Sequence, residues 1–216
     1  MASIASLLTA VVTVVQIIVF AVWPPPSCQP TPSATGAIFE MLRSNPVLGF
    51  VELDGLMLVD YPLIAVVFLA LYIALRHVQP VLALIGTVFA LIAITAYFTA
   101  NPALSMLALS AHYPSPGTVA AGQAVLADFQ GSAFIVHYLL MGVAGLLVSF
   151  AMLRSAVFSR ATATAGLLQG AMMLVPSTVG TIGLIFALGS LAPFLVWFVL
   201  IALRLQRLAR ESTSSA

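Results

Sequence analysis

The stretch SAFIVHYLLMGVAGLLVSFAML, residues 132–153, carries no charged side chain and is followed at once by Arg154. A helix needs about 20 apolar residues to cross the hydrocarbon core of a bilayer. A segment this long and this apolar is predicted to be a transmembrane helix, and the arginine that closes it marks one membrane surface. The same pairing of an apolar segment with an arginine recurs along the chain and decides the fold.

The composition also indicates a membrane protein and excludes a soluble domain. The chain has 216 residues, of which 62% are hydrophobic and 6% are charged, and its mean hydropathy is +1.17. Soluble domains carry about 25% charged residues. The net charge of +1 provides no basic surface for nucleic acid. The single Cys28 excludes an internal disulfide and a cysteine-rich metal site.

We predict an all-α, polytopic bundle of about six transmembrane helices that forms one domain over residues 1–216. Helices are required because lipid cannot satisfy the backbone polar groups of an isolated strand. Only a tight turn at 187–190 separates the last two segments, and a single long kinked helix is the alternative there. The first segment lacks the positive start of a secretory signal, so we expect it to be retained. The predicted spans are 4–23, 55–75, 80–99, 132–153, 162–185 and 190–208.

The arginines predict the orientation of this bundle. Cytoplasmic loops of membrane proteins carry an excess of arginine and lysine. The chain has no lysine, and six of its seven arginines fall on one side if both termini are cytoplasmic. Those six are Arg76, Arg154, Arg160, Arg204, Arg207 and Arg210, whereas the exterior side receives Glu40, Glu52, Asp54 and Asp128 together with Arg43.

Two connections, 24–54 and 100–131, are too long to be simple turns, and both would lie on the exterior side. Their capping and amphipathic patterns predict short exterior helices at 36–44, 103–111 and 118–129. Together these helices could form a functional lid over the outer end of the bundle. A seal that merely closes this end is the alternative.

Small residues indicate where helices pack closely. Gly166 and Gly170 form a G-x-x-x-G pair in the fifth predicted span, and Gly142 with Gly145 thins the fourth. Small residues let helix backbones approach each other in lipid. We expect Gly166 and Gly170 to serve helix packing inside the bundle, with a contact between two copies of the chain as the alternative.

Asp60 and His137 are the candidate catalytic residues, because ionisable groups inside a membrane are costly and are functional candidates by default. They precede Arg76 and Arg154 by about 16 and 17 residues, which at 1.5 Å per residue places both ~24–26 Å from the arginine level. Both are therefore expected at one depth near the exterior face. Side chains at a similar depth are the ligand-binding candidates Tyr61, Tyr97, Tyr138 and Ser177, with Thr178 and Thr181 beside the last.

Several chemistries fit this pair. A carboxylate that faces an imidazole can act as a general acid and base or relay a proton, whereas a buried pair that only fixes helix register is the structural alternative. His137 could also be an axial ligand of haem or chlorophyll. No ligand spacing indicates a metal site, and no phosphate-binding loop or nucleophile motif occurs. The sequence therefore favours a protein that is not an enzyme.

Several motifs resemble those of one known family. They are NPALSMLALSAHY at 101–113, AAGQA at 120–124, the segment from MLRS at 152–155 through FSRATA at 158–163 to GLL at 166–168, and the segment from DYPL at 60–63 to LYIAL at 71–75. Together they are similar to a bacterial multi-pass membrane family described only as a domain of unknown function. The resemblance implies six helices and the bacterial cytoplasmic membrane, and it implies no activity. In that family a small residue often stands at the position of His137, so any role of His137 would be particular to this chain.

Two functions follow as hypotheses. The first is a non-enzymatic integral membrane protein that acts as an accessory or assembly subunit of a larger membrane complex, with the bilayer and other membrane subunits as partners. The alternative is a transporter or intramembrane enzyme that handles a small molecule or lipid at an exterior-facing polar site. This alternative predicts an apolar cavity that reaches both Asp60 and His137.

Overall fold

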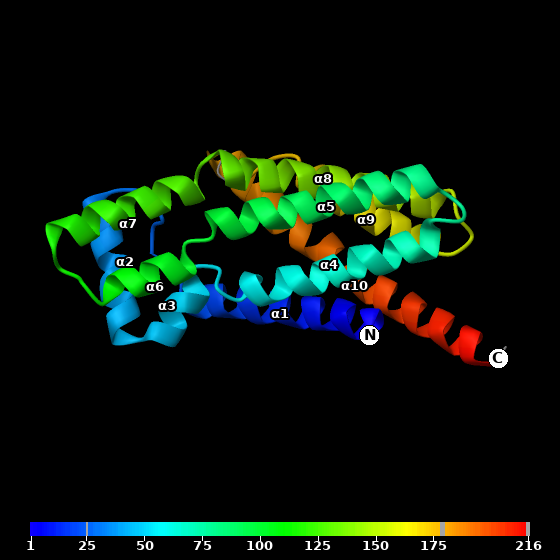
Figure 1. Ribbon diagram of the computed structural model, residues 1–216, viewed down its shortest axis with the longest axis horizontal. Helices are drawn as coiled ribbons and strands as arrows, with labels where there is room; N and C mark the ends of the chain where they lie inside the picture. The colour runs from blue at the N-terminus through cyan, green and yellow to red at the C-terminus, as the bar shows by residue number, and fades with distance from the viewer. Residues whose placement is uncertain (25, 178–179, 215–216) are drawn as a thin grey trace.

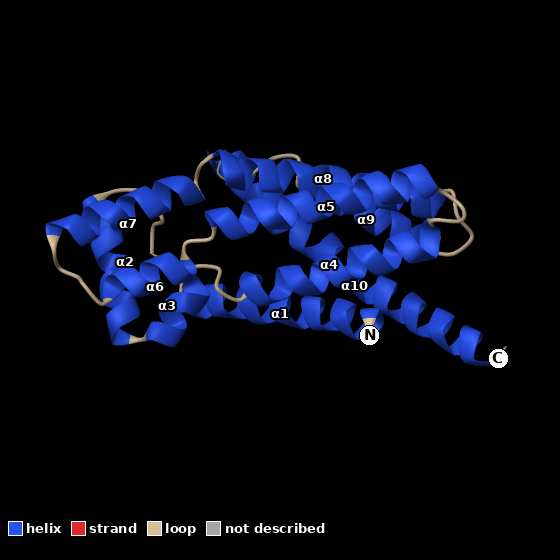
Figure 2. Cartoon of the chain, in the orientation of Figure 1, coloured by secondary structure: helices blue, strands red, loops and turns tan. Residues whose placement is uncertain are grey.

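The computed structural model describes residues 1–24, 26–177 and 180–214, the last three by backbone alone. In this part of the chain every regular element is an α-helix (Figure 2). Figure 1 shows a bundle of long helices with shorter helices gathered at one end of it. The bundle helices are α1 (Ala2–Val22), α4 (Met57–Leu75), α5 (Pro80–Ala100), α8 (Ser132–Leu153), α9 (Arg160–Met172) and α10 (Gly180–Ser214), and the shorter ones, which we call the cap, are α2 (Pro32–Ser44), α3 (Pro46–Glu52), α6 (Ala103–Ser110) and α7 (Pro116–Phe129).

Among the described residues, five helical stretches are long and apolar enough to cross a bilayer, which supports the predicted integral membrane protein. They contain α1, α4, α5, α8 and α10. The bundle helix α9 is the exception, with 13 residues. At 1.5 Å per residue it is about 20 Å long, which is shorter than the ~30 Å hydrocarbon core.

The turn predicted at 187–190 is wrong, because these residues lie inside α10. Ser190 donates its hydroxyl hydrogen bond to the carbonyl oxygen of Ala187 at 2.7 Å, a bond that a helix accommodates. The helix boundary falls earlier, between Met172 at the end of α9 and Gly180 at the start of α10. Pro176 lies in this interval and cannot continue a helix. The predicted boundaries 162–185 and 190–208, and the alternative of one long kinked helix, are therefore wrong as well.

The bundle helices contact each other in a closed ring. In chain order α1 packs on α4, α4 on α5, α5 on α8, α8 on α9 and α9 on α10, and α10 returns to α1. Side chains must fill the centre of such a ring. Near the middle of the bundle Phe68, Trp197 and Phe198 do so, with ring centroids 6.0 Å apart for Phe68 and Trp197 and 5.3 Å apart for Trp197 and Phe198.

The cap has a hydrophobic core of its own, in which Phe39 of α2, Met106 of α6 and Leu126 of α7 are completely buried. Its helices α2, α6 and α7 occupy the segments for which short helices are predicted. Both α2 and α7 begin earlier than expected. The side chains of Thr31 and Ser115 accept hydrogen bonds from the backbone as N-caps, and a proline follows each as the first helical residue.

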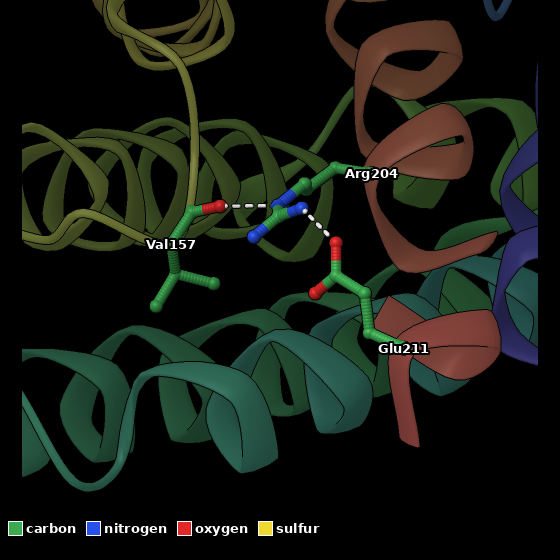
Figure 3. Close-up of polar contacts among 3 residues, drawn as sticks. All are labelled: Val157, Arg204 and Glu211. Carbon is green, nitrogen blue, oxygen red and sulfur yellow. Dashed lines mark hydrogen bonds and ion pairs between the residues drawn. The ribbon is translucent and has the colours of Figure 1, made fainter. Parts of the chain in front are cut away.

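The arginines other than Arg43, which belongs to α2 of the cap, lie at the opposite end of the bundle, which we call the arginine end. Arg76 caps α4, Arg154 caps α8 and Arg160 begins α9, and Figure 1 shows these helix ends on the same side, toward which both chain termini also point. Arg204 of α10 fastens this end (Figure 3). Its Nε donates to the carbonyl oxygen of Val157 at 2.6 Å, and its Nη1 lies 3.1 Å from Oε1 of Glu211.

Helices α8 and α9 touch through glycines, in a contact that we call the glycine seam. A side-chain carbon added at Gly170 would lie 2.8 Å from the carbonyl oxygen of Gly142 and 2.9 Å from the backbone nitrogen of Leu146. No methyl group fits at these distances, so the two backbones approach as closely as glycine allows. Gly166 faces Ser149 of α8 and Trp197 of α10 equally closely. In this structure Gly166 and Gly170 both lie at contacts inside the bundle.

The glycine seam gives a first testable prediction. Gly170→Ala forces α8 and α9 apart against backbone atoms, and we expect a loss of about 1–3 kcal/mol of stability, typical of an overpacked core. Thermal unfolding of the purified protein in mild detergent measures this as a lower melting temperature. Gly117→Ala is the matched control, because nothing lies within 4 Å of the added carbon there. Equal melting temperatures for the two variants would contradict the close contact.

Candidate functional site

A cavity of about 550 Å³ lies inside the ring of helices, between the middle of the bundle and the cap. Among the described residues every bundle helix contributes to its walls, and most of the lining side chains are aliphatic or aromatic. Its inner end is formed by Phe68, Trp197 and Phe198. All six candidates named from the sequence line this one cavity: Asp60, Tyr61, Tyr97, His137, Tyr138 and Ser177. Thr178 lies outside the described residues.

Tyr61 and His137 form the central polar contact of the cavity. The hydroxyl oxygen of Tyr61 on α4 lies 2.7 Å from Nε2 of His137 on α8. The other ring nitrogen, Nδ1, lies 3.0 Å from the carbonyl oxygen of Ala93 on α5. A carbonyl oxygen only accepts, so Nδ1 carries a hydrogen, and in the neutral ring Nε2 accepts from the Tyr61 hydroxyl. The histidine thereby joins three helices and has one defined tautomer.

Aromatic rings surround this histidine. The ring centroids of Tyr61 and Tyr97 each lie 5.0 Å from that of His137, and those of Tyr138 and Phe134 lie 5.7 and 6.2 Å away. The hydroxyl of Tyr97 accepts a hydrogen bond at 3.0 Å from Nδ2 of Asn101. These contacts hold the rings in place and leave their edges and faces to line the cavity. We call Tyr61, Tyr97, Phe134 and Tyr138 the aromatic cluster.

Asp60 lines the same cavity and does not bind His137. Both nitrogens of His137 have other partners, so the direct carboxylate–imidazole pair considered from the sequence is not formed. The side chain of Asp60 is 1% exposed, and its Oδ1 has no hydrogen-bond partner in the described part of the chain. A buried carboxylate oxygen without a partner is rare and costly. Asp60 is therefore a buried group with unfilled hydrogen-bonding capacity, and the side chain of Thr9 on α1 lies beside it.

Two of the glutamines that line the cavity have an oxygen without a described partner. Gln16 of α1 donates from Nε2 to the carbonyl oxygen of Val51 at 3.1 Å, and its Oε1 lacks a described partner. Gln169 of α9 has its Nε2 2.6 Å from the sulfur of Met173, four residues later in the chain, and its unpartnered Oε1 lies beside Gly145 at the glycine seam. Gln16 was not predicted from the sequence. A polar side chain within an apolar span was the available signal.

Two acidic residues lie near the cap end of the cavity, and one of them lines it. Asp54 lines it, and Glu52 on α3 is 3% exposed with both carboxylate oxygens unpartnered among the described residues. Burial and, to a smaller extent, the charge of Glu52 raise the pKa of Asp54 to about 7, and burial raises the pKa of Glu52. Burial, and to a smaller extent the charges of Asp54 and Glu52, raise the pKa of the Cys28 thiol to about 11. Its thiol is therefore a weak nucleophile at neutral pH.

The surroundings of His137 decide whether it can be an axial ligand of haem or chlorophyll. An axial ligand of haem or chlorophyll needs one free ring nitrogen. The bond from Nδ1 to the carbonyl oxygen of Ala93 could remain, but Nε2 must first lose the Tyr61 hydroxyl. The aromatic cluster packs around the ring where a macrocycle would have to approach. The residues present do not fit such a group. Among the described residues no cluster of histidine, cysteine and carboxylate side chains is arranged to hold a metal ion.

Comparison with models of known protein families, with curated proteins and with solved structures gives no match. Membership of the bacterial multi-pass family therefore stays a prediction from the motifs. The class of protein that fold and site define is an all-helical, membrane-type bundle with an internal cavity.

The Tyr61–His137 contact gives the second prediction. Tyr61→Phe removes the hydroxyl and leaves Nε2 of a buried ring without a donor, which costs about 1–3 kcal/mol. We expect a lower melting temperature and a changed ¹⁵N chemical shift of the His137 ring. Tyr72→Phe on the same helix is the control, since no hydrogen bond of its hydroxyl is seen in the structure. An unchanged ¹⁵N spectrum for Tyr61→Phe would show that the contact is not made.

Proposed function

We propose that this protein is an integral membrane protein that binds a small amphipathic molecule in the cavity between α1, α4, α8 and α10. The observation that carries the proposal is one cavity of about 550 Å³ that brings together Asp60, His137 and the four ligand-binding candidates Tyr61, Tyr97, Tyr138 and Ser177. Ligand sites typically enclose about 300–1,000 Å³, with mostly apolar walls and a few placed polar groups. Transport and catalysis both begin with such binding.

The polar groups of the cavity support binding over a purely structural role. A polar cluster that only fixes helix register would satisfy its own hydrogen bonds, because each unpaired buried group is costly. Here Tyr61 and His137 do so, whereas Asp60 and Gln16 each keep an oxygen without a described partner. A bound molecule that donates hydrogen bonds would complete the set.

The walls of the cavity suggest a route for an apolar ligand. Leu188 of α10 lines the cavity and is 60% exposed, and Phe20 of α1 lines it and is half-buried. Figure 1 shows α1 and the first half of α10 lying apart toward the cap end. Because Leu188 both lines the cavity and is exposed, the cavity has an opening beside it on the side of the bundle, where lipid would surround the helices. The route supports a ligand that comes from the bilayer.

The orientation in the membrane is part of the proposal. The arginine end would be cytoplasmic, because arginine is enriched on that side of membrane proteins, and the cap would then be exterior in a bacterial cytoplasmic membrane. α9 and the non-helical residues that follow it would form the fifth of six crossings. Pro176 lies among those residues. Non-helical backbone is tolerated at membrane depth where it lines a cavity, and Ser177 does line this one.

The accessory-subunit role expected from the sequence stays a prediction. The exposed apolar side chains of the bundle are those expected of any lipid-facing surface. They do not separate a partner-binding face from a lipid-binding one.

A third prediction tests the orientation. In a Cys28→Ser background, Ala37→Cys in the cap and Ala156→Cys at the arginine end both place a thiol at an exposed alanine. We expect a membrane-impermeant maleimide, added to intact cells, to label Ala37→Cys. Ala156→Cys should react only after the membrane is opened. The reverse pattern would invert the proposed orientation.

The fourth prediction tests the cavity as a binding site. Leu188→Trp would place a large side chain in the opening, whereas Leu184→Trp changes an equally exposed leucine of α10 that does not line the cavity. We expect native mass spectrometry of protein released from its own membranes to detect a bound small molecule in the unaltered protein and in Leu184→Trp. Leu188→Trp should lose most of it. Equal occupancy in both variants would place the ligand elsewhere, and a ligand-free unaltered protein would contradict the proposal.

A further inference from the structure

Two fully buried and unpartnered atoms on side chains that line the cavity are hydrogen-bond acceptors. They are Oδ1 of Asp60 and Oε1 of Gln16, on side chains that are 1% and 6% exposed. The acceptor role of Gln16 is fixed, because its Nε2 donates to a carbonyl oxygen. Two other fully buried and unpartnered atoms of lining residues face the glycine seam instead: Oε1 of Gln169 lies beside Gly145, and Nε1 of Trp197 lies beside Gly166. The acceptors of Asp60 and Gln16 favour a ligand that donates hydrogen bonds.

The charges of the cavity have one sign. Among the described lining residues there is no arginine, and the chain has no lysine. His137 cannot neutralise Asp60, since Tyr61 and Ala93 occupy both of its nitrogens. A carboxylate deep in an apolar site is costly unless a cation accompanies it. Asp54 adds a second carboxyl group at the cap end.

The aromatic cluster adds a second feature that favours a cation. Four aromatic rings, those of Tyr61, Tyr97, Phe134 and Tyr138, line the same cavity as Asp60, with the Tyr61 and Tyr97 centroids 4.3 Å apart and those of Phe134 and Tyr138 5.1 Å apart. The faces of aromatic rings attract ammonium groups, most strongly where water is excluded. A carboxylate and several aromatic rings in one cavity are a set of groups that suits an ammonium ligand.

We propose that the ligand of this cavity is a cationic amphiphile, whose ammonium group binds Asp60 and the aromatic cluster. The inference rests on the proposed function and adds the chemical class of the ligand. Its apolar part would lie along Ile64, Met141 and Phe198 toward the inner end of the cavity. An anionic amphiphile would bring its charge to two carboxyl groups and find no positively charged partner.

Trp197 provides a reporter for the test. The chain has two tryptophans; Trp23 is 53% exposed at the end of α1, whereas Trp197 is 1% exposed at the inner end of the cavity. In a Trp23→Phe variant in lipid nanodiscs, the emission comes from Trp197 alone. A brominated alkyl chain quenches tryptophan by contact, so saturable quenching reports a chain inside the cavity. The probes are brominated dodecyltrimethylammonium and the neutral brominated dodecanol.

We expect the cationic probe to quench Trp197 saturably and to bind at least about tenfold more tightly than the neutral probe, as for a desolvated ion pair with cation–π contacts. Asp60→Asn should remove this preference and leave quenching by the neutral probe intact, which also shows that the variant is folded. Asp128→Asn, an exposed carboxylate of α7 outside the cavity, is the matched control and should behave as the unaltered protein.

The outcomes separate the two proposals. Equal affinities for both probes, or a cation preference that survives Asp60→Asn, would overturn the cationic class and leave the binding function standing. Absence of saturable quenching by either probe would overturn the binding function itself.

Discussion

The contact of α8 with α9 at the glycine seam constrains the rest of the bundle. No side chain separates the two backbones where Gly142 faces Gly170, so α9 is held close against α8 although it is too short to cross the membrane alone. That position directs Gln169 and Met173 toward the cavity. It also requires the chain to leave helical geometry before α10 can begin at the cap end. The irregular segment near Pro176 and the open interior of the ring follow from the same close contact.

The interior of the ring is divided into two parts with different physical character. Toward the middle of the bundle Phe68, Trp197 and Phe198 fill the space with rings in contact. Toward the cap the side chains leave a cavity of about 550 Å³ between them. Polar atoms are concentrated in this second part. Unpaired acceptors in a closed protein interior reduce stability, so their presence in the hollow half is better explained by a ligand than by folding.

The sequence selected residues that share one cavity and left open which of them contact each other. Counting from the arginines placed Asp60 and His137 at one level, and both line the cavity. Counting along a helix does not say which way a side chain points, and neighbouring residues differ by about 100° around the axis. Tyr61 therefore contacts His137, while Asp60 does not. The sequence around His137 gave no means to choose between these partners.

The position of the break between α9 and α10 could not be predicted from the sequence either. Ala187, Gly189 and Ser190 are common in turns, but inside an apolar segment their small size fits a continuous helix. Pro176 was recognised as a probable kink, yet a proline inside α4, Pro62, leaves that helix continuous. Whether a proline bends or ends a helix depends on tertiary contacts. Here the preceding helix is held by glycines that a local pattern identifies only as small residues.

The hydrogen bond between α1 and α10 has a mechanical consequence. The Ser6 hydroxyl donates to the carbonyl oxygen of Phe198 at 2.6 Å, on the arginine side of the cavity. The residues of α1 and α10 that line the cavity all lie on the cap side of this bond. A tilt of α1 about Ser6 would widen or narrow the opening beside Leu188 and leave the glycine seam on the far side of the ring unchanged. The glycine contacts of α8 and α9 thus fix one side of the ring, whereas α1 on the other side would tilt about its hydrogen bond to α10.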